Sequence, residues 1–197
     1  MDKIRATLAA SKMYQARKIL KPTNLAFLCH FDNSSEDISS YHTPCQTSPT
    51  YSTSGRYGAY CLSGTAAYNA NLDFSGDFSI DFQLKSSGNF DATFGSFQIY
   101  TDGSNLNLGG RWRAWGNMRS DVFTHHCFFR WNNVLYYYKN GLYYASVSQA
   151  GNYSASNITI KGSATVLVNE VRIVTGICPW TSNFTPPTAP YTGFEAL

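Results

Sequence analysis

The chain carries little charge, and the charge it has is unevenly spread. Only 14% of its 197 residues are Asp, Glu, Lys or Arg, against about 25% in an average globular protein. Residues 1–21 hold six lysines and arginines and one aspartate, whereas residues 22–197 hold nine cationic and eleven anionic side chains. Because the body of the chain is faintly acidic, a nucleic-acid-binding surface over that body is not expected.

Long apolar runs are also missing. No stretch approaches the ~20 apolar residues of a membrane span. The N-terminus has cations but lacks the continuous apolar core of a signal peptide. Four N-x-S/T matches occur, at Asn33, Asn152, Asn157 and Asn183. Without a secretion signal we interpret them as chance matches in a chain rich in Asn, Ser and Thr.

The cysteines form no recognisable metal or disulfide framework. There are five, at irregular spacings and without a C-x-x-C pair, which argues against a zinc site and excludes a complete set of disulfides. We predict buried free thiols in a reducing compartment, since a buried cysteine behaves as a small apolar residue. A single disulfide involving Cys45 is the alternative.

Motifs of common enzymes are absent. The sequence has no G-x-S-x-G nucleophile elbow, no H-E-x-x-H zinc motif and no phosphate-binding loop. His125, His126 and Cys127 are adjacent, but neighbours on a strand point to opposite faces and do not chelate one ion together. We expect them to be packing residues.

One segment has the composition of a helix. Residues 2–20 contain good helix formers and no Gly or Pro, with apolar residues at spacings of three and four. Pro22 ends it, so we divide the chain into a basic helical arm, residues 1–21, and a body, residues 22–197. The apolar stripe is modest and lacks Trp and Phe, which makes membrane binding the least expected role. Docking on a partner protein suits such an arm best, and contact with nucleic acid is the other alternative. The residues expected to carry this attachment are Ile4, Leu8, Met13, Arg17 and Leu20.

The body reads as short strands between turns. It is rich in aromatic residues and glycine, and residues 78–86 alternate Phe78, Ile80, Phe82 and Leu84 with polar residues, which predicts a half-buried strand. Asn140-Gly141 between two tyrosine-rich segments predicts a hairpin with a two-residue turn. Many such strands indicate an all-β, two-sheet antiparallel sandwich. The tail after residue 175 is rich in proline but keeps Trp180, Phe184 and Tyr191, so we expect it to pack on the sandwich.

The order of these pieces resembles a known family. The segments LAFLCHFDN, SGRYGAYCLSG, LDFSGDFSIDFQLKSS, HHCFFRWNNVLYYYKNG and ITIKGSATVLVNEVRI follow one another along the chain, and the match covers residues 24–191. Together they resemble laminin-G-like members of the concanavalin A-like lectin and glucanase superfamily. The tail segment FTPPTAPY is similar to the variant found in tailed-bacteriophage virion proteins. The resemblance implies a jelly-roll sandwich whose tail wraps one end and covers exposed strand edges.

The resemblance also implies two site types that can be checked in the sequence. Superfamily glucanases carry alternating acids in an E-x-D-x-x-E pattern on one strand, which this chain lacks, so we predict no enzymatic activity. Several members hold a structural Ca²⁺, and the matching positions here are Asp32 and Asn169. Because an amide replaces an expected carboxylate, we predict no cofactor and leave a weak structural Ca²⁺ open.

Two aromatic segments are candidates for ligand recognition. If residues 110–117 form a strand, Arg111, Arg113 and Trp115 share one face. Aromatic rings stack on sugar faces and arginine supplies planar donors, so these residues could bind a glycan; the alternative is a core tryptophan beside solvated arginines. Tyr136 and Tyr138 share a face in the hairpin and allow the same two interpretations.

These observations lead to one hypothesis and two rivals. We expect a non-enzymatic structural component of a phage virion (capsid decoration, tail or fibre), assembled in the host cytoplasm, present in many copies or as a homo-oligomer, attached to other virion proteins through residues 1–21 and displaying its sandwich toward host-surface glycans. The first rival is a free carbohydrate-binding lectin outside any particle. The second is a hydrolase.

Overall fold

The computed structural model describes residues 24–192 except residues 103, 150, 179 and 181. The predicted helix over residues 2–20, with the attachment residues Ile4, Leu8, Met13, Arg17 and Leu20, lies outside the described residues. The predicted boundary between arm and body at residue 22 also lies outside the described residues.

The described residues form an all-β fold of sixteen strands in three antiparallel sheets. The eight-stranded sheet contains β1 (Leu25–Cys29), β2 (Tyr51–Ser52), β3 (Cys61–Leu62), β6 (Phe78–Ser86), β11 (Ser120–Trp131), β12 (Val134–Lys139), β13 (Leu142–Ser148) and β16 (Val166–Thr175). The six-stranded sheet contains β4 (Thr65–Tyr68), β7 (Asp91–Phe94), β8 (Phe97–Thr101), β9 (Leu106–Leu108), β10 (Arg111–Arg113) and β15 (Ile158–Lys161). The third sheet pairs β5 (Leu72–Phe74) with β14 (Tyr153–Ala155).

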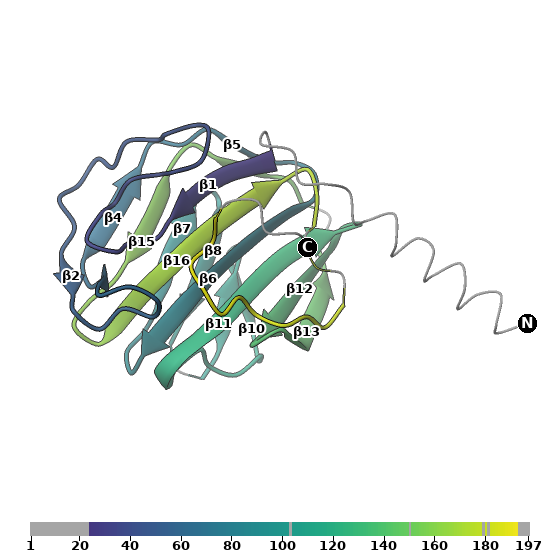
Figure 1. Ribbon diagram of the computed structural model, residues 1–197. Helices are drawn as coiled ribbons and strands as arrows, with labels where there is room; N and C mark the ends of the chain where they lie inside the picture. The colour runs from purple at the N-terminus through teal and green to yellow at the C-terminus, as the bar shows by residue number, and fades with distance from the viewer. Residues whose placement is uncertain (1–23, 103, 150, 179, 181, 193–197) are drawn as a thin grey trace, which may run out of the picture.

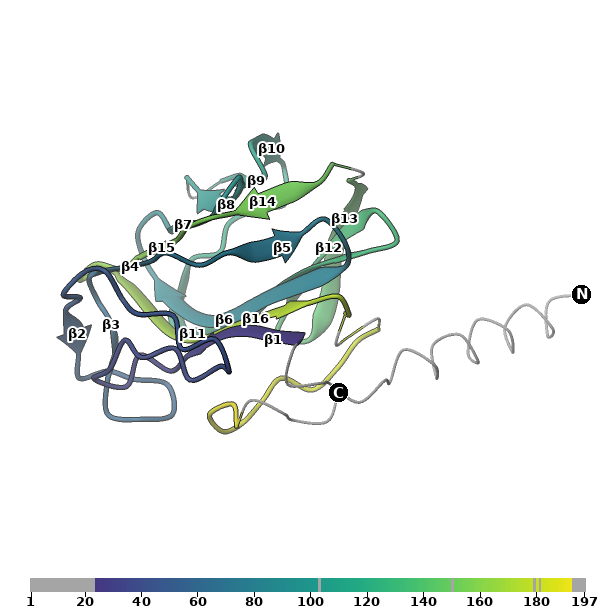
Figure 2. The ribbon, with the colours of Figure 1, turned by 90° about the horizontal axis from the view of Figure 1, so that it is seen from above.

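The two large sheets lie face to face, so the predicted antiparallel sandwich is confirmed (Figures 1 and 2). The six-stranded sheet runs in the order β10-β9-β8-β7-β15-β4, and the eight-stranded sheet in the order β13-β12-β11-β6-β16-β3-β2, with β1 also paired to β16. The small β5–β14 sheet bridges the layers at one side, where Phe74 stacks on Phe78 at 4.5 Å and Tyr153 contacts Phe97 at 5.0 Å. In the described residues no helix is long and apolar enough to cross a membrane.

Period-two alternation explains the core in the six-stranded sheet. Ala92 and Phe94 of β7, Ile99 of β8 and Ile158 and Ile160 of β15 are all buried in the shared core. Their neighbours along each strand point to the other side because successive side chains of a strand alternate between faces. The six-stranded sheet therefore has one apolar face and one face turned to solvent.

The eight-stranded sheet departs from this pattern, and the prediction of a half-buried strand over residues 78–86 is wrong. In β6 the polar residues Ser79, Asp81 and Gln83 are as buried as the phenylalanines between them. The outer face of β6 is covered, because Tyr191 of the tail and Tyr57 of the 55–60 loop hydrogen-bond to Asp81 and Gln83. Non-local chain segments, which strand alternation does not reveal, bury this face.

The C-terminal tail lies on the outer face of the eight-stranded sheet (Figures 1 and 2). Trp180 and Phe184 stack on each other at 4.1 Å, and Phe184 packs against Tyr138 at 5.8 Å. Further along, the Tyr191 amide donates to Glu170 Oε2 at 2.9 Å. The tail is packed, as expected, but it covers the middle of a sheet face, whereas the sequence predicted that it covers strand edges at one end.

The hairpin between β12 and β13 supports the tail. Asn140 and Gly141 both have positive φ, 51° and 74°, as a two-residue type I′ turn requires. The Phe184 amide donates to the Gly141 carbonyl at 2.9 Å, and a Cβ added at Gly141 would lie 1.9 Å from the Phe184 carbonyl oxygen. Glycine here therefore permits both the turn and the close approach of the tail.

Candidate functional site

The outer face of the six-stranded sheet carries two cross-strand rows of side chains. Strand register places one row across all six strands and the other across β4, β15, β7 and β8. The first row consists of Thr65, Lys161, Asp91, Tyr100, Asn107 and Trp112, and the second of Ala67, Thr159, Thr93 and Gln98. We call these ten residues the outer face.

The first row ends in an aromatic pair. Trp112 of the edge strand β10 is 53% exposed, although tryptophan is usually well buried. Its ring meets the Tyr100 ring edge to face at 5.6 Å. Between them in register lies Asn107, which is only 8% exposed and whose Oδ1 has no hydrogen-bond partner among the described residues. An exposed indole therefore stands beside a buried amide oxygen that has no partner among the described residues.

A series of side-chain hydrogen bonds holds this aromatic end in place. Asn89 Nδ2 donates to the Tyr100 hydroxyl at 3.3 Å, and Arg119 donates to Asn89 Oδ1 at 2.8 Å. Arg119 also reaches the Asp102 carbonyl at 3.5 Å. Tyr100 is thus oriented before any ligand arrives, which lowers the entropy cost of binding.

The other end of the outer face is polar. Lys161 Nζ lies 2.6 Å from Asp91 Oδ2, and Gln98 Nε2 donates to Asp91 Oδ1 at 3.0 Å. Beside this pair, a hollow of about 460 Å³ opens along Thr93, Thr159 and Lys161 and the 95–96 and 156–157 turns. Its lining side chains are mostly hydroxyl and amide groups, which donate and accept hydrogen bonds with equal ease.

The outer face thus combines an exposed aromatic platform with hydroxyl, amide and paired charged groups. Such a surface matches a ligand with apolar C–H faces and many hydroxyls, because rings stack on the former and polar groups bond the latter. Of the ten outer-face residues Asp91 is the only carboxylate, and Lys161 pairs with it.

The structure separates the three glycan candidates predicted near β10. The strand ends at Arg113, and Gly116 has a φ of +71°, so the assumed alternation does not extend to Trp115. Trp115 is half-buried against the core and stacks parallel to Tyr137 at 6.3 Å. Arg111 and Arg113 pair with the core residues Leu108 and Leu106, and so point to the opposite side of β10 from Trp112. The exposed tryptophan is therefore Trp112, which is not among the candidate residues named from the sequence.

Tyr136 and Tyr138 share one face of β12, but not with the arginines. They belong to an aromatic cluster on the tail-covered side of the eight-stranded sheet, together with Phe129, Trp180 and Phe184. Tyr138 is buried there. Since the tail covers them, the five predicted glycan residues do not form one surface.

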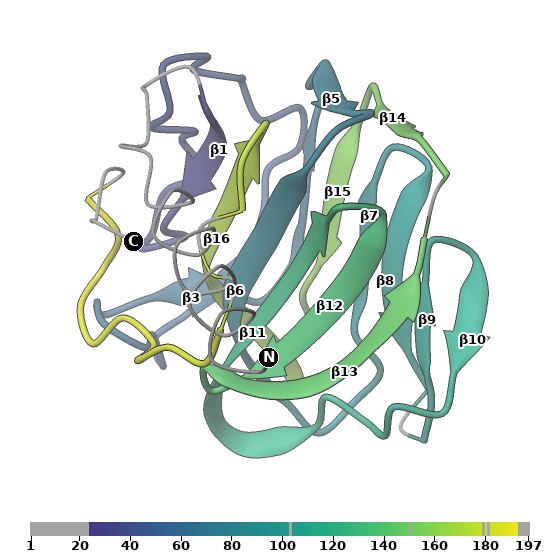
Figure 3. The same ribbon diagram turned by 90° about the vertical axis from the view of Figure 1, so that its right-hand side faces the viewer.

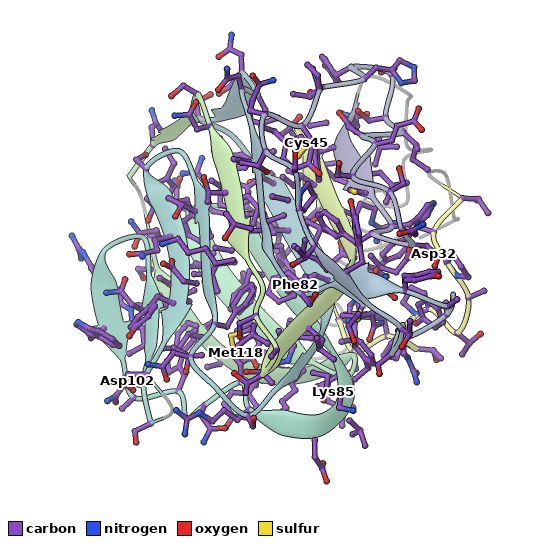
Figure 4. The ribbon with its side chains drawn as sticks, turned by 90° about the vertical axis from the view of Figure 1, so that its left-hand side faces the viewer. Asp32, Cys45, Phe82, Lys85, Asp102 and Met118 are labelled. Atoms are coloured by element: carbon purple, nitrogen blue, oxygen red, sulfur yellow. The ribbon has the colours of Figure 1, made fainter. Side chains whose placement is uncertain are left out.

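Asp32 and Asn169 hold a loop together. Asp32 Oδ1 accepts from the Tyr60 amide at 2.9 Å, and Asn169 Oδ1 accepts from the Arg56 amide at 3.0 Å. The Asn169 amide group donates to the His30 carbonyl. Each of these two oxygens thus accepts from a backbone amide of the 55–60 loop, and the weak structural Ca²⁺ at Asp32 and Asn169 stays a prediction. In Figure 4, Asp32 lies at the opposite side of the molecule from Asp102, the residue near the aromatic end of the outer face.

Asp81 and Arg172 form the centre of a buried polar network under the tail. Arg172 Nε donates to Asp81 Oδ2 at 3.2 Å, and the other oxygen accepts from the Tyr191 hydroxyl. The Arg172 guanidinium lies 4.0 Å from the Tyr191 ring centre. Burial alone would raise the pKa of Asp81, but the Arg172 charge, followed by His125 and Tyr191, outweighs it and holds the pKa below its ordinary value of 3.8. Asp81 is therefore a buried carboxylate kept ionised by its partners.

The His125-His126-Cys127 segment behaves as the sequence predicted. His125 faces the tail and bonds the Tyr191 hydroxyl at 3.0 Å, whereas His126 faces the core and bonds the Tyr137 hydroxyl at 2.8 Å. Burial, then the Asp81 charge, raises the pKa of Cys127 well above its ordinary value of 9.0. All five cysteines lie in the described part of the chain, and all five are free thiols.

The sequence analysis missed the outer face almost entirely. The one available signal was local: Gly109-Gly110 predicts a tight turn, which would have placed Trp112 opposite Asn107. The rest of the row joins strands far apart in the chain, as with Asp91 and Lys161, which are 70 residues apart.

Comparison with known proteins supports the fold. No protein-family model matches the chain, and no curated protein matches it. Among solved structures, domain 4 of the extracellular arabinanase AbnA from Geobacillus stearothermophilus, a complex with arabinotriose, has a TM-score of 0.57 at 17% identity, covering 78% of this chain and 93% of that domain. A Trypanosoma rangeli sialidase complex has a TM-score of 0.55 at 8% identity, covering 88% of this chain and 32% of the sialidase.

At these identities the likeness shows the fold alone. That fold is a β-sandwich. This chain spans about a third of the sialidase's length.

Proposed function

We propose that the sandwich is a non-catalytic glycan-binding module whose ligand lies across the outer face of the six-stranded sheet. The observation that carries this proposal is Trp112, an exposed indole fixed beside Tyr100 and the unpartnered Asn107 oxygen. Sugars stack on such rings and bond to such amides. The bound arabinotriose in the structurally similar arabinanase domain is in keeping with a glycan ligand.

The experiment is a glycan array followed by calorimetry with the strongest ligand. We expect Trp112→Ala to weaken binding by about tenfold or more, as loss of one stacking contact of ~1.4 kcal/mol would, and to leave the fold intact because the side chain is exposed. Trp115→Ala is the matched control, since its half-buried ring packs on the core. We expect it to lower the melting temperature while the folded fraction still binds. Absence of binding across the whole array would sink the proposal.

The chemistry of the acids supports a non-enzymatic role. Sugar hydrolysis needs two carboxyl groups facing one bond, about 5–5.5 Å apart in retaining enzymes. The outer face has one carboxylate, and Asp81 is buried beneath the tail. Glycan cleavage by the purified protein would contradict this part of the proposal.

We further propose that the module is displayed on a phage virion and attached through residues 1–21. This part rests on the resemblance of the tail to phage virion proteins and on the basic character of the N-terminal segment. A charged, amphipathic segment next to a sandwich suits docking to a particle that presents many copies.

Sedimentation of particles tests this attachment. The full chain is expected to co-sediment with virions in fixed stoichiometry, and a variant lacking residues 1–21 to remain in the supernatant while still binding glycan. A full chain absent from purified particles would leave a free lectin as the better description.

A further inference from the structure

Strand β10 presents different chemistry on its two sides. Trp112 belongs to the outer face, while Arg111 and Arg113 point to the inner side, where they pair in register with Leu108 and Leu106. Because β10 is the last strand of its sheet, these arginines lie at the margin of the sandwich. Figure 3 shows β13, at the margin of the other sheet, curving round toward β10. A Cβ added at Gly116 would lie 2.9 Å from the Tyr144 hydroxyl, which confirms that the margins meet there.

A buried phenol lies beside this margin. Tyr153 is only 8% exposed, and its hydroxyl has no hydrogen-bond partner among the described residues. That hydroxyl abuts the β9–β10 turn, since a Cβ added at Gly109 would lie 2.3 Å from it. Burial raises the pKa of Tyr153, and the nearby positive charges of Arg111, Arg130 and Arg113 act against this rise. The phenol thus sits among cationic groups with its own donor unused.

The two β10 arginines differ from their buried neighbour. Arg130 donates to the backbone carbonyls of Ser75, Gly76 and Gly151. Arg111 and Arg113 have no such partners in the described part of the chain: no carboxylate forms an ion pair with them, and the buried Nε of Arg113 is without an acceptor. Within the described residues these two guanidinium groups and the Tyr153 hydroxyl therefore have no recorded acceptor, and an anion placed between them would accept from all three.

We propose that Arg111, Arg113 and Tyr153 form a subsite for a carboxylate, so that the ligand of the outer face is an acidic glycan such as a polyuronate. This inference rests on the proposed glycan binding. A chain stacked on Trp112 and crossing the β10 edge brings its acidic group to the arginines on the other side of the same strand. Paired donors from arginine suit a carboxylate, because they bond both of its oxygens.

The test is a ¹⁵N NMR titration of the full chain with an oligogalacturonide and with the same oligosaccharide after methyl esterification. The ester removes the charge and keeps the sugar chain. We expect the acid form to shift both the Trp112 indole signal and the Nε–H signals of Arg111 and Arg113. The ester should shift the indole alone and bind about tenfold more weakly, as loss of a charge-assisted hydrogen-bond pair implies.

Substitutions distinguish a loss of the arginine charge from a general loss of folded structure. Arg113→Gln should remove most of the preference for the acid form, Arg113→Lys should keep part of it, and Tyr153→Phe should reduce it. Arg56→Gln, which changes an exposed arginine within the 55–60 loop, should have no effect. Equal binding of acid and ester with unmoved arginine signals would overturn the subsite and leave the proposed function standing. If neither the acid oligosaccharide, nor its ester, nor any glycan of the array shifted the Trp112 indole signal, the carboxylate subsite and the proposed glycan binding would both be contradicted.

Discussion

At the scale of single residues, the structure contrasts two aspartates in opposite surroundings. Asp81 is fully buried and bonded to Arg172 and Tyr191, whereas Asp91 pairs with Lys161 on the solvent side of its sheet. Both make ion pairs, but exposure decides what each pair contributes. Breaking a buried pair leaves an uncompensated charge, while an exposed pair contributes about 0–1 kcal/mol.

Asp81→Asn is therefore expected to lower the free energy of unfolding by about 3–5 kcal/mol, the range for losing one partner of a buried pair. Asp91→Asn, the matched control, should lower it by less than about 1 kcal/mol. Urea unfolding at neutral pH measures both. Equal, small effects would show that the network under the tail contributes little to stability.

Asp81 should also make the free energy of unfolding depend on pH. The pKa of Asp81 is below 3.8 in the folded protein and close to 3.8 when unfolded, so the unfolded chain takes up the proton first. The stabilisation is complete above about pH 4 and is lost as the pH falls through the folded pKa. Urea unfolding at pH 5 and pH 3 should show a smaller drop for Asp81→Asn than for the unaltered chain. A drop of the same size in both would contradict the assignment.

At the scale of elements, the tail after β16 acts as a cover for one sheet face. Its contacts are spread along the segment, from Trp180 and Phe184 on the β11–β12 aromatic cluster to Tyr191 at the charged network. It also accepts from the Tyr57 hydroxyl through the Pro187 carbonyl. A segment without strand or helix is thus held by side chains at several points, which explains why its aromatics are there.

Phe184→Ala should loosen this cover. We expect the free energy of unfolding to fall by about 1–2 kcal/mol, since a half-buried ring loses less than the 3–5 kcal/mol of a fully buried one. Limited proteolysis should then cut within residues 180–190 before the sandwich unfolds. Val122→Ala removes an exposed side chain and should leave both measurements unchanged. A tail that resists protease equally in the two variants would argue against this role of Phe184.

At the scale of the whole molecule, sequence reasoning reached the sandwich, but its five candidate glycan residues do not lie on one surface. The Asn140-Gly141 turn is a local signal, and the hairpin that it predicts is present. The polar residues of β6 looked exposed because the segments that bury them, around Tyr57 and Tyr191, are distant in the sequence. The same limit applies to the outer face, which arises only when six strands are placed side by side.

The position of β16 bears on how the protein is made. It is the last of the described strands in the chain, yet it lies inside the eight-stranded sheet, with β6 on one side and β1 and β3 on the other. During translation the nascent chain therefore lacks the middle of its larger layer until residues 166–175 have left the ribosome. Until then β1 and β6 expose edges without partners. We expect cells to shield this intermediate with chaperones, and expression to depend on them more than the stability of the finished protein would suggest.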